Sequence, residues 1–251
     1  MGEQIGILPI QGTIDNINFY KSAAGYRVRK KGGVSGKKIA SDKAFQRTRE
    51  NMSEFGRACR ASKLVRLAFV SLLRNSKDAK SYARLVKEMM KVIKADSTSD
   101  RGQRNVIDGE LNMLEGFDFN INAVLSTTFT KTYSASIDRV TGKLVVDMPA
   151  FVGADDIVEP TGATHFRIVS AAAEIDFEQK LYQTDGKNSD IMPLDSSPVP
   201  GIKLENTLPA ASAHPLLLIF GIEFYQSVSG KLYPLKNGSF NALKLVKISG
   251  V

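Results

Sequence analysis

The fold is decided by residues 216–226, which read Leu-Leu-Leu-Ile-Phe-Gly-Ile-Glu-Phe-Tyr-Gln. Apolar side chains follow one another here without the polar alternation of a half-exposed strand. A run of this kind, at strand length, predicts a central strand that is buried on both faces. Ser229 and Gly230 follow it, and this pair predicts the turn of a hairpin.

Further strand patterns lie on both sides of this run, from about residue 117 onwards. Short apolar or alternating segments, separated by Gly, Pro, Asn and Asp, predict strands at residues 117–120, 126–132, 134–137, 143–148, 165–170, 174–178, 180–183, 231–235 and 241–248. Many short strands joined by such turns predict an antiparallel β-sandwich or jelly roll over residues 111–251.

The first 110 residues have a different pattern. Short alternating segments at residues 5–8, 13–20 and 26–29 predict a small β-hairpin or meander. In it, Tyr26 and Val28 would face one way and the neighbouring arginines the other.

Two amphipathic helices are predicted next, and they complete an α+β fold. The first runs from about Ser41, which would cap it, to about residue 74, and the second covers residues 78–94. Residues 95–105 are polar and aperiodic, which is typical of a linker. The sequence therefore predicts two parts, a basic N-terminal region over 1–110 and a β-sandwich-like domain over 111–251.

Positive charge is concentrated in the first part. Residues 1–110 hold 23 Lys and Arg against 11 Asp and Glu, whereas residues 111–251 hold 11 against 15. Basic charge is the main contribution to non-specific nucleic-acid affinity, so the N-terminal half is predicted to bind a polyanion. The predicted polyanion-binding residues are Lys21, Arg27, Arg29, Lys30, Lys31, Lys37, Lys38, Lys43, Arg47 and Arg49.

Aromatic residues are interleaved with these cations. Tyr20 and Tyr26 are predicted base-stacking residues, because aromatic rings stack on bases while Lys and Arg bind phosphates. The alternative is that the rings pack the small sheet and the charges are only solvated.

Few residues are suited to catalysis. The only cysteine is Cys59, and there are two histidines, so a zinc site with about four N or S ligands is not expected. No Gly-x-Ser-x-Gly elbow is present, and the Gly-Lys pair in the basic loop does not complete a phosphate-binding motif. The sequence predicts no enzyme, no cofactor and no metal.

Two carboxylate clusters are the exception to this scarcity, and one of them is Asp155 and Asp156 with Glu159 in a predicted loop. Glu174, Asp176 and Glu178 alternate on a predicted strand and would share one face, where they could hold a cation or do acid–base work. The alternative is a solvated sheet face.

The chain lacks the signals of membrane insertion and secretion. No apolar run approaches the ~20 residues that span a bilayer, and no basic start precedes an apolar stretch at the N-terminus. We expect a protein in the cytoplasm, or in a particle assembled there. Export without an N-terminal signal stays open.

Several segments together resemble a family of basic proteins from Bacteroidota bacteria. The segments are residues 12–14, 17–20, 47–51, 54–56, 116–119, 163–167 and 221–226. The family has no assigned function, so the resemblance implies a bacterial or phage origin and carries no activity or site.

Three hypotheses follow from the sequence. The first is a structural or binding protein, coat-like or nucleoid-like, that contacts nucleic acid or another polyanion and forms a homo-oligomer. The second is a filament, tail or tube subunit without nucleic acid. The third is a cation-dependent or carbohydrate-acting enzyme that uses the carboxylates.

Overall fold

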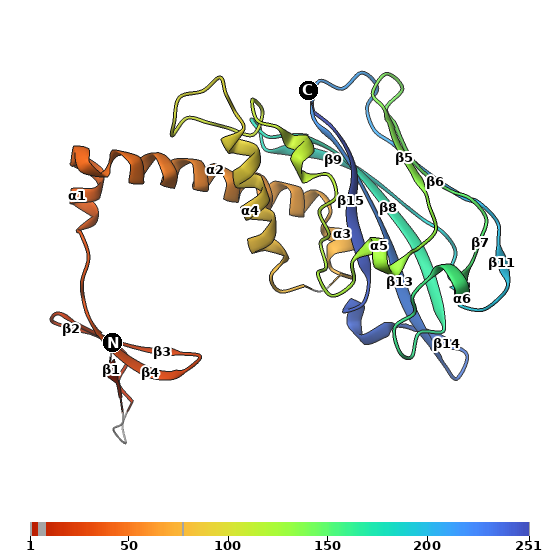
Figure 1. Ribbon diagram of the computed structural model, residues 1–251, viewed down its shortest axis with the longest axis horizontal. Helices are drawn as coiled ribbons and strands as arrows, with labels where there is room; N and C mark the ends of the chain where they lie inside the picture. Colours follow the sequence, from red (N-terminus) through yellow and green to blue (C-terminus); the bar gives the residue numbers. More distant parts are fainter. Residues whose placement is uncertain (1, 5–8, 77, 251) are drawn as a thin grey trace. The chain divides into compact units, whose positions relative to one another are not determined.

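The computed structural model describes residues 2–4, 9–76 and 78–250, and the chain divides into two compact units, Met1–Glu50 and Asn51–Val251 (Figure 1). The boundary therefore lies at residue 50, well before the boundary near 110 that the sequence predicted. Among the described residues, no helix is long and apolar enough to cross a membrane.

The N-terminal unit is built on an antiparallel sheet of order β1-β4-β3-β2. Its strands are β1 (Gly2–Glu3), β2 (Gly12–Ile14), β3 (Ile17–Ser22) and β4 (Gly25–Lys30). An antiparallel meander forms, but the single strand predicted at 13–20 is wrong. Asp15, with a φ of +48°, and Asn16 form a turn that divides it into β2 and β3. The strand predicted at 5–8 lies outside the described residues. None of the residues described in this unit is buried.

Helices follow this sheet. Helix α1 (Gly36–Ser41) and the 3₁₀ helix η1 (Lys43–Phe45) precede α2 (Gln46–Ala68). Ser35 caps α1, and Asp42 caps η1, so the cap predicted at Ser41 is wrong. The hydroxyl of Ser41 donates instead to a carbonyl of α1.

A large antiparallel sheet is the centre of the C-terminal unit. Its strands are β8 (His165–Asp176), β9 (Leu181–Asn188), β10 (Met192–Pro193), β13 (Leu216–Val228), β14 (Lys231–Pro234) and β15 (Ala242–Ser249). Strand β13 pairs with β8 along one edge and with β15 and β14 along the other. Residues 216–224 are all buried, which confirms the predicted central strand.

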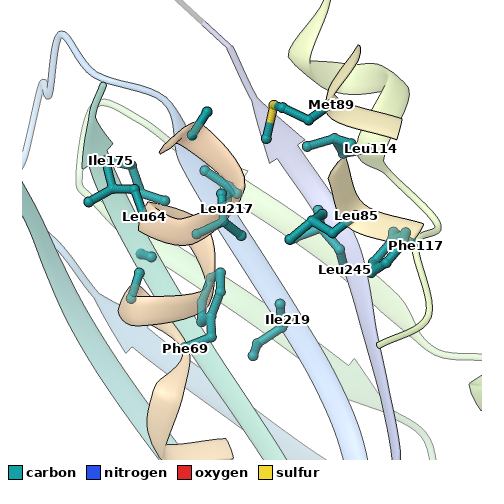
Figure 2. Packing of buried hydrophobic residues seen from close by; sticks show 14 of the residues in the cluster. Leu64, Phe69, Leu85, Met89, Leu114, Phe117, Ile175, Leu217, Ile219 and Leu245 are labelled. Atoms are coloured by element: carbon teal, nitrogen blue, oxygen red, sulfur yellow. The ribbon is translucent and has the colours of Figure 1, made fainter. Parts of the chain in front are cut away.

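Helices cover one face of this sheet. Helix α2 continues through α3 (Val70–Leu73), and α4 (Ser81–Lys94) lies beside it (Figure 1). Figure 2 shows their apolar side chains packed against the sheet; the labelled residues include Leu64, Phe69, Leu85, Met89, Ile175, Leu217, Ile219 and Leu245. The helix pair therefore shares a core with the strands, and this is why the boundary is not at 110.

A second core lies on the opposite face. There a smaller sheet forms from β5 (Ser134–Asp138), β6 (Lys143–Met148) and β12 (Ile202–Thr207), with β6 in the middle. Successive side chains of a strand point to opposite faces. Leu217 and Ile219 therefore enter the helical core, whereas Leu218 and Phe220 enter the second core with Val146. The mixed α+β class is confirmed.

Short elements complete the C-terminal unit. They are η2 (Leu111–Leu114), α5 (Leu125–Thr128), β7 (Phe151–Val152), α6 (Gly153–Asp156), β11 (Pro198–Val199) and η3 (Leu235–Gly238). The strand predicted at 126–132 does not form, because α5 occupies its start and Phe129 makes only an isolated bridge with Ile157. The strand predicted at 117–120 is likewise reduced to an isolated bridge between Asp118 and Lys244. The carboxylate of Asp118 accepts the Leu125 N–H, and the hydroxyl of Thr128 donates to the Val124 carbonyl.

The segment predicted as a linker, residues 95–105, is anchored to the helices. Asp96 is buried and accepts N–H groups from Thr98, Ser99 and Asn105. Burial opposes ionisation of Asp96, but these hydrogen bonds hold its pKa well below the usual value. The segment is a fixed loop of the C-terminal unit rather than a linker.

Helix α2 contributes two charged side chains to the same loop. The carboxylate of Glu54 accepts the Gly102 N–H at 2.8 Å, and Arg57 donates to the carbonyls of Gly102 and Arg104 at 2.6 and 3.1 Å. Glu54 and Arg57 lie more than forty positions before the loop residues that they bind.

Candidate polyanion interface

The pairing of β3 with β4 sorts the basic residues onto the two faces of the N-terminal sheet. Tyr20 pairs with Arg27, and Asn18 pairs with Arg29, so these four side chains share one face. The opposite face carries Phe19 and Val28 together with Ile17, Tyr26 and two lysines. The predicted separation of Tyr26 and Val28 from the arginines is confirmed.

The first face gathers two arginines around a tyrosine. The Arg29 guanidinium carbon lies 5.4 Å from the centroid of the Tyr20 ring, and Arg27 stands directly across from Tyr20. A guanidinium over an aromatic ring is attracted by the ring's negative face. This contact holds Arg29 near Arg27, so two cationic groups with fixed donors lie side by side on one sheet surface.

The second face has a different composition. Lys21 pairs with Tyr26, and its ammonium nitrogen lies 5.6 Å from the centroid of that ring. Lys30 pairs with Ile17 at the other end of the hairpin. Because Tyr20 and Tyr26 lie on opposite faces, they do not form one stacking platform, and base stacking remains a prediction for each separately.

Most of the remaining cations are exposed. Lys31 lies just after β4, Lys37 and Lys38 on α1, Lys43 on η1 and Arg47 on α2, and all five are exposed. Within the part of the chain that the structure describes, no ion pair joins any of the ten predicted cations to an acidic side chain. Their charge is therefore not neutralised by an acidic group there.

Arg49 differs from the other nine. Its guanidinium donates to the carbonyls of Ile39 and Asp42, at 2.7 and 2.8 Å, and it is half-buried. These contacts tie α1 and η1 to the start of α2, so Arg49 supports the arrangement of the unit. The sequence showed its charge but not this structural role.

The candidate carboxylate cluster comes together only in part. Strand β8 ends at Asp176, whose carboxylate accepts the N–H groups of Glu178 and Gln179 in the following turn. Glu174 is buried and accepts a hydrogen bond from Ser212. The predicted shared face therefore holds for Glu174 and Asp176, which line one pocket with His214, but not for Glu178, which belongs to the turn rather than to the strand. Over the described residues, no group of three or more His, Cys, Asp and Glu is placed to hold a metal ion.

The two histidines lie in different parts of the C-terminal unit. The Nδ1 of His165 is 2.9 Å from the Thr164 hydroxyl at the start of β8. The Nε2 of His214 is 3.9 Å from Asp176, in a pocket of about 260 Å³ between the β8–β9 hairpin and the loop before β13. Cys59 is half-buried beside the helical core.

Sequence reasoning missed a buried charged network on β13. Glu223 is buried and accepts hydrogen bonds from Arg167, Tyr225 and Asn75. Burial and the Glu223 carboxylate raise the pKa of Tyr225 to about 12. The sequence did contain an indication of this network, since Glu223 is the one charged residue in the apolar run 216–226. A charge in a strand buried on both faces requires a partner.

Comparison of the chain with protein-family models, with curated proteins and with solved structures found no match. The resemblance to the Bacteroidota family stays a prediction.

Proposed function

We propose that this protein is a non-catalytic binding and assembly protein whose N-terminal unit binds nucleic acid or another polyanion. The observation that carries the proposal is the arrangement of cations in residues 1–50. These hold ten Lys and Arg against four Asp and Glu, and eight of the ten cations are exposed. A surface of this kind releases counterions from a polyanion when it binds.

The side-chain chemistry favours a phosphate backbone over a single acidic group. Arg27 and Arg29 offer planar guanidinium groups that bind phosphate oxygens in pairs, and the lysines of the loop and of α1 add point charges. The cations are spread over a sheet, the loop after it, the helices α1 and α2 and the 3₁₀ helix η1, which suits an extended ligand.

The C-terminal unit would serve as the assembly body. We interpret the two sheets around the second core as a sandwich-like body, and a homo-oligomer formed through it would place several basic units together. Several linked weak sites raise the apparent affinity for a long polyanion. A coat-like or nucleoid-like role in the cytoplasm fits this arrangement.

The experiment is a salt titration of binding with the full-length chain. A labelled single-stranded DNA is titrated by fluorescence anisotropy between about 50 and 200 mM salt. The quadruple variant Arg29→Gln, Lys30→Gln, Lys37→Gln and Lys38→Gln should bind more weakly. Its slope of log affinity against log salt should fall by about 3, since each contact with a single strand contributes roughly 0.7.

A matched variant controls for net charge. Lys80, Lys87, Lys91 and Lys94 are exposed and lie on or next to α4 in the C-terminal unit, and changing them to Gln removes the same charge. This control should keep the wild-type slope. Equal losses in both variants, or no salt-dependent binding by the wild type, would refute the proposal.

The self-assembling subunit without nucleic acid remains the second candidate. The apolar face of the N-terminal sheet favours it, because Ile14 and Ile17 are 58% and 44% exposed. Negative-stain microscopy separates the two candidates. Regular particles free of nucleic acid, lost in the variant Ile14→Lys with Ile17→Lys, would favour the filament or tube subunit.

A further inference from the structure

A pocket of about 450 Å³ lies on the C-terminal unit, beside the helical core. Helix α2, the loop after α4 and the β8–β9 turn surround it. The lining residues are Arg57, Arg60, Ala61, Lys63, Leu64, Leu67, Asn105, Val106, Ile107, Phe177 and Lys180. Its volume is in the range of small-molecule sites.

The floor of the pocket is apolar. Leu64, whose packing on Ile175 is visible in Figure 2, forms the part nearest the core. Leu67 and Ile107 lie further out and are 40% and 42% exposed. These two side chains leave apolar surface in contact with water, inside a concavity that a ligand's apolar part would fill.

The rim of the pocket is cationic. Arg60, Lys63 and Lys180 are exposed, and Arg57 lies at the end near the loop. No acidic residue is among the described residues that line the pocket, and none of these lysines and arginines is in an ion pair there. A ligand with a negative head would meet several positive groups and no opposing charge.

The walls are fixed before any ligand arrives. Arg57 donates to the carbonyls of Gly102 and Arg104, and Asp96 accepts the N–H of Asn105, so the loop is anchored where it enters the pocket wall. Asp176 fixes the turn wall through the N–H groups of residues 178 and 179. A preformed site loses less conformational entropy on binding.

We propose that this pocket binds a single-chain amphipathic anion, with a carboxylate or phosphate head on the cationic rim and an aliphatic tail on the apolar floor. The inference stands on the C-terminal unit alone and does not depend on the polyanion interface. A short anion would leave the floor uncovered, and a cationic amphiphile would be repelled by the rim.

The test is calorimetric titration of the full-length chain with dodecanoate below its micelle concentration. We expect one site per chain. Dodecyl phosphate should bind comparably, whereas dodecyltrimethylammonium and acetate should bind at least tenfold more weakly. A separate titration with vesicles of anionic lipid distinguishes binding of a free amphiphile from binding to a membrane surface.

Lys180 permits a variant that removes a rim cation without strain. Its φ is +62°, a left-handed conformation that glycine adopts freely, so Lys180→Gly should fold at least as well as the wild type. The variant should weaken dodecanoate binding several-fold. Lys236→Gly is the matched control, because Lys236 also has a positive φ, of +41°, and lies outside the pocket.

The floor is tested with Leu67→Asp, which should abolish binding. Val70→Asp is its control, since Val70 is an exposed apolar residue of α3 outside the pocket. The proposal is overturned if dodecanoate and dodecyltrimethylammonium bind equally, or if only vesicles bind. It is also overturned if the chain is a dimer that Leu67→Asp dissociates and dodecanoate gives no heat, because a second copy would then occupy the pocket.

Discussion

The two units of this chain contain similar strands but bury them to very different extents. In the C-terminal unit, residues 216–224 of β13 are all buried, and alternate side chains enter two separate cores. In the N-terminal unit, β3 and β4 also place their apolar side chains at alternating positions, yet none of its described residues is buried.

The difference teaches that alternation alone does not make a core. The apolar face of a sheet is buried only where a second layer covers it. The sheet around β13 has helices on one face and β6 with its neighbours on the other. The N-terminal sheet keeps its apolar face at least partly exposed, and its cations stay available to a partner. Under the proposed function, stability would come mainly from the C-terminal unit and polyanion binding from the N-terminal unit.

The largest expected effect comes from one phenylalanine in each unit. Phe220 is fully buried in the second core, so Phe220→Ala should lower the free energy of unfolding by about 3–5 kcal/mol. Phe19 is only half-buried on β3, so Phe19→Ala should cost under about 1 kcal/mol. Urea unfolding followed by circular dichroism measures both. Equal losses of unfolding free energy in the two variants would contradict the contrast between the units.

A smaller, pH-dependent effect is expected at Asp96. Its lowered pKa means that the ionised carboxylate stabilises the fold above the unfolded-state pKa of about 3.9. That contribution is lost as the pH falls through the folded-state pKa. Asp96→Asn should therefore cost about 1–3 kcal/mol at pH 7 and progressively less as the pH is lowered from about 4.

Urea titrations of the wild type and of Asp96→Asn at several pH values measure this dependence. A difference that stays constant down to about pH 2 would show that the carboxylate charge is not what holds the loop. The matched change Asp100→Asn, at an exposed position of the same loop, should have little effect on stability at any pH.

The smallest expected effect is at Gly56, in the interior of α2. A Cβ there would lie 3.4 Å from a terminal nitrogen of Arg60, which is the end of a flexible side chain. Gly56→Ala should raise the free energy of unfolding by about 0.5–1 kcal/mol, because glycine has more conformational freedom to lose. Gly238→Ala is the contrasting variant, since its Cβ would lie 1.8 Å from the Asn75 carbonyl oxygen and should destabilise the protein.

Local pattern was enough to predict several elements of the fold. Strand β6 forms at the predicted residues, β13 is central, and α4 begins within a few residues of its predicted start. These segments are fixed by their own apolar periodicity. The same alternation placed Arg27 and Arg29 on one face of β4.

The missed features depend on distant partners. A strand buried on both faces needs two covering layers, but its own residues do not say that α2 and α4 supply one of them. Polar residues 95–105 suggested a linker because their anchors, Glu54 and Arg57, lie far away in the sequence. Glu178 left the strand because the Asp176 carboxylate caps the turn.

Hydrogen exchange on the full-length chain, with and without a single-stranded DNA, tests the central claim most directly. We predict fast exchange of the amides of residues 17–30 in the free protein and marked slowing when DNA is bound. The amides of β8 and β13 should exchange slowly and equally in both states. The account is contradicted if β3 and β4 are already as protected as β13, or if DNA protects only the C-terminal unit.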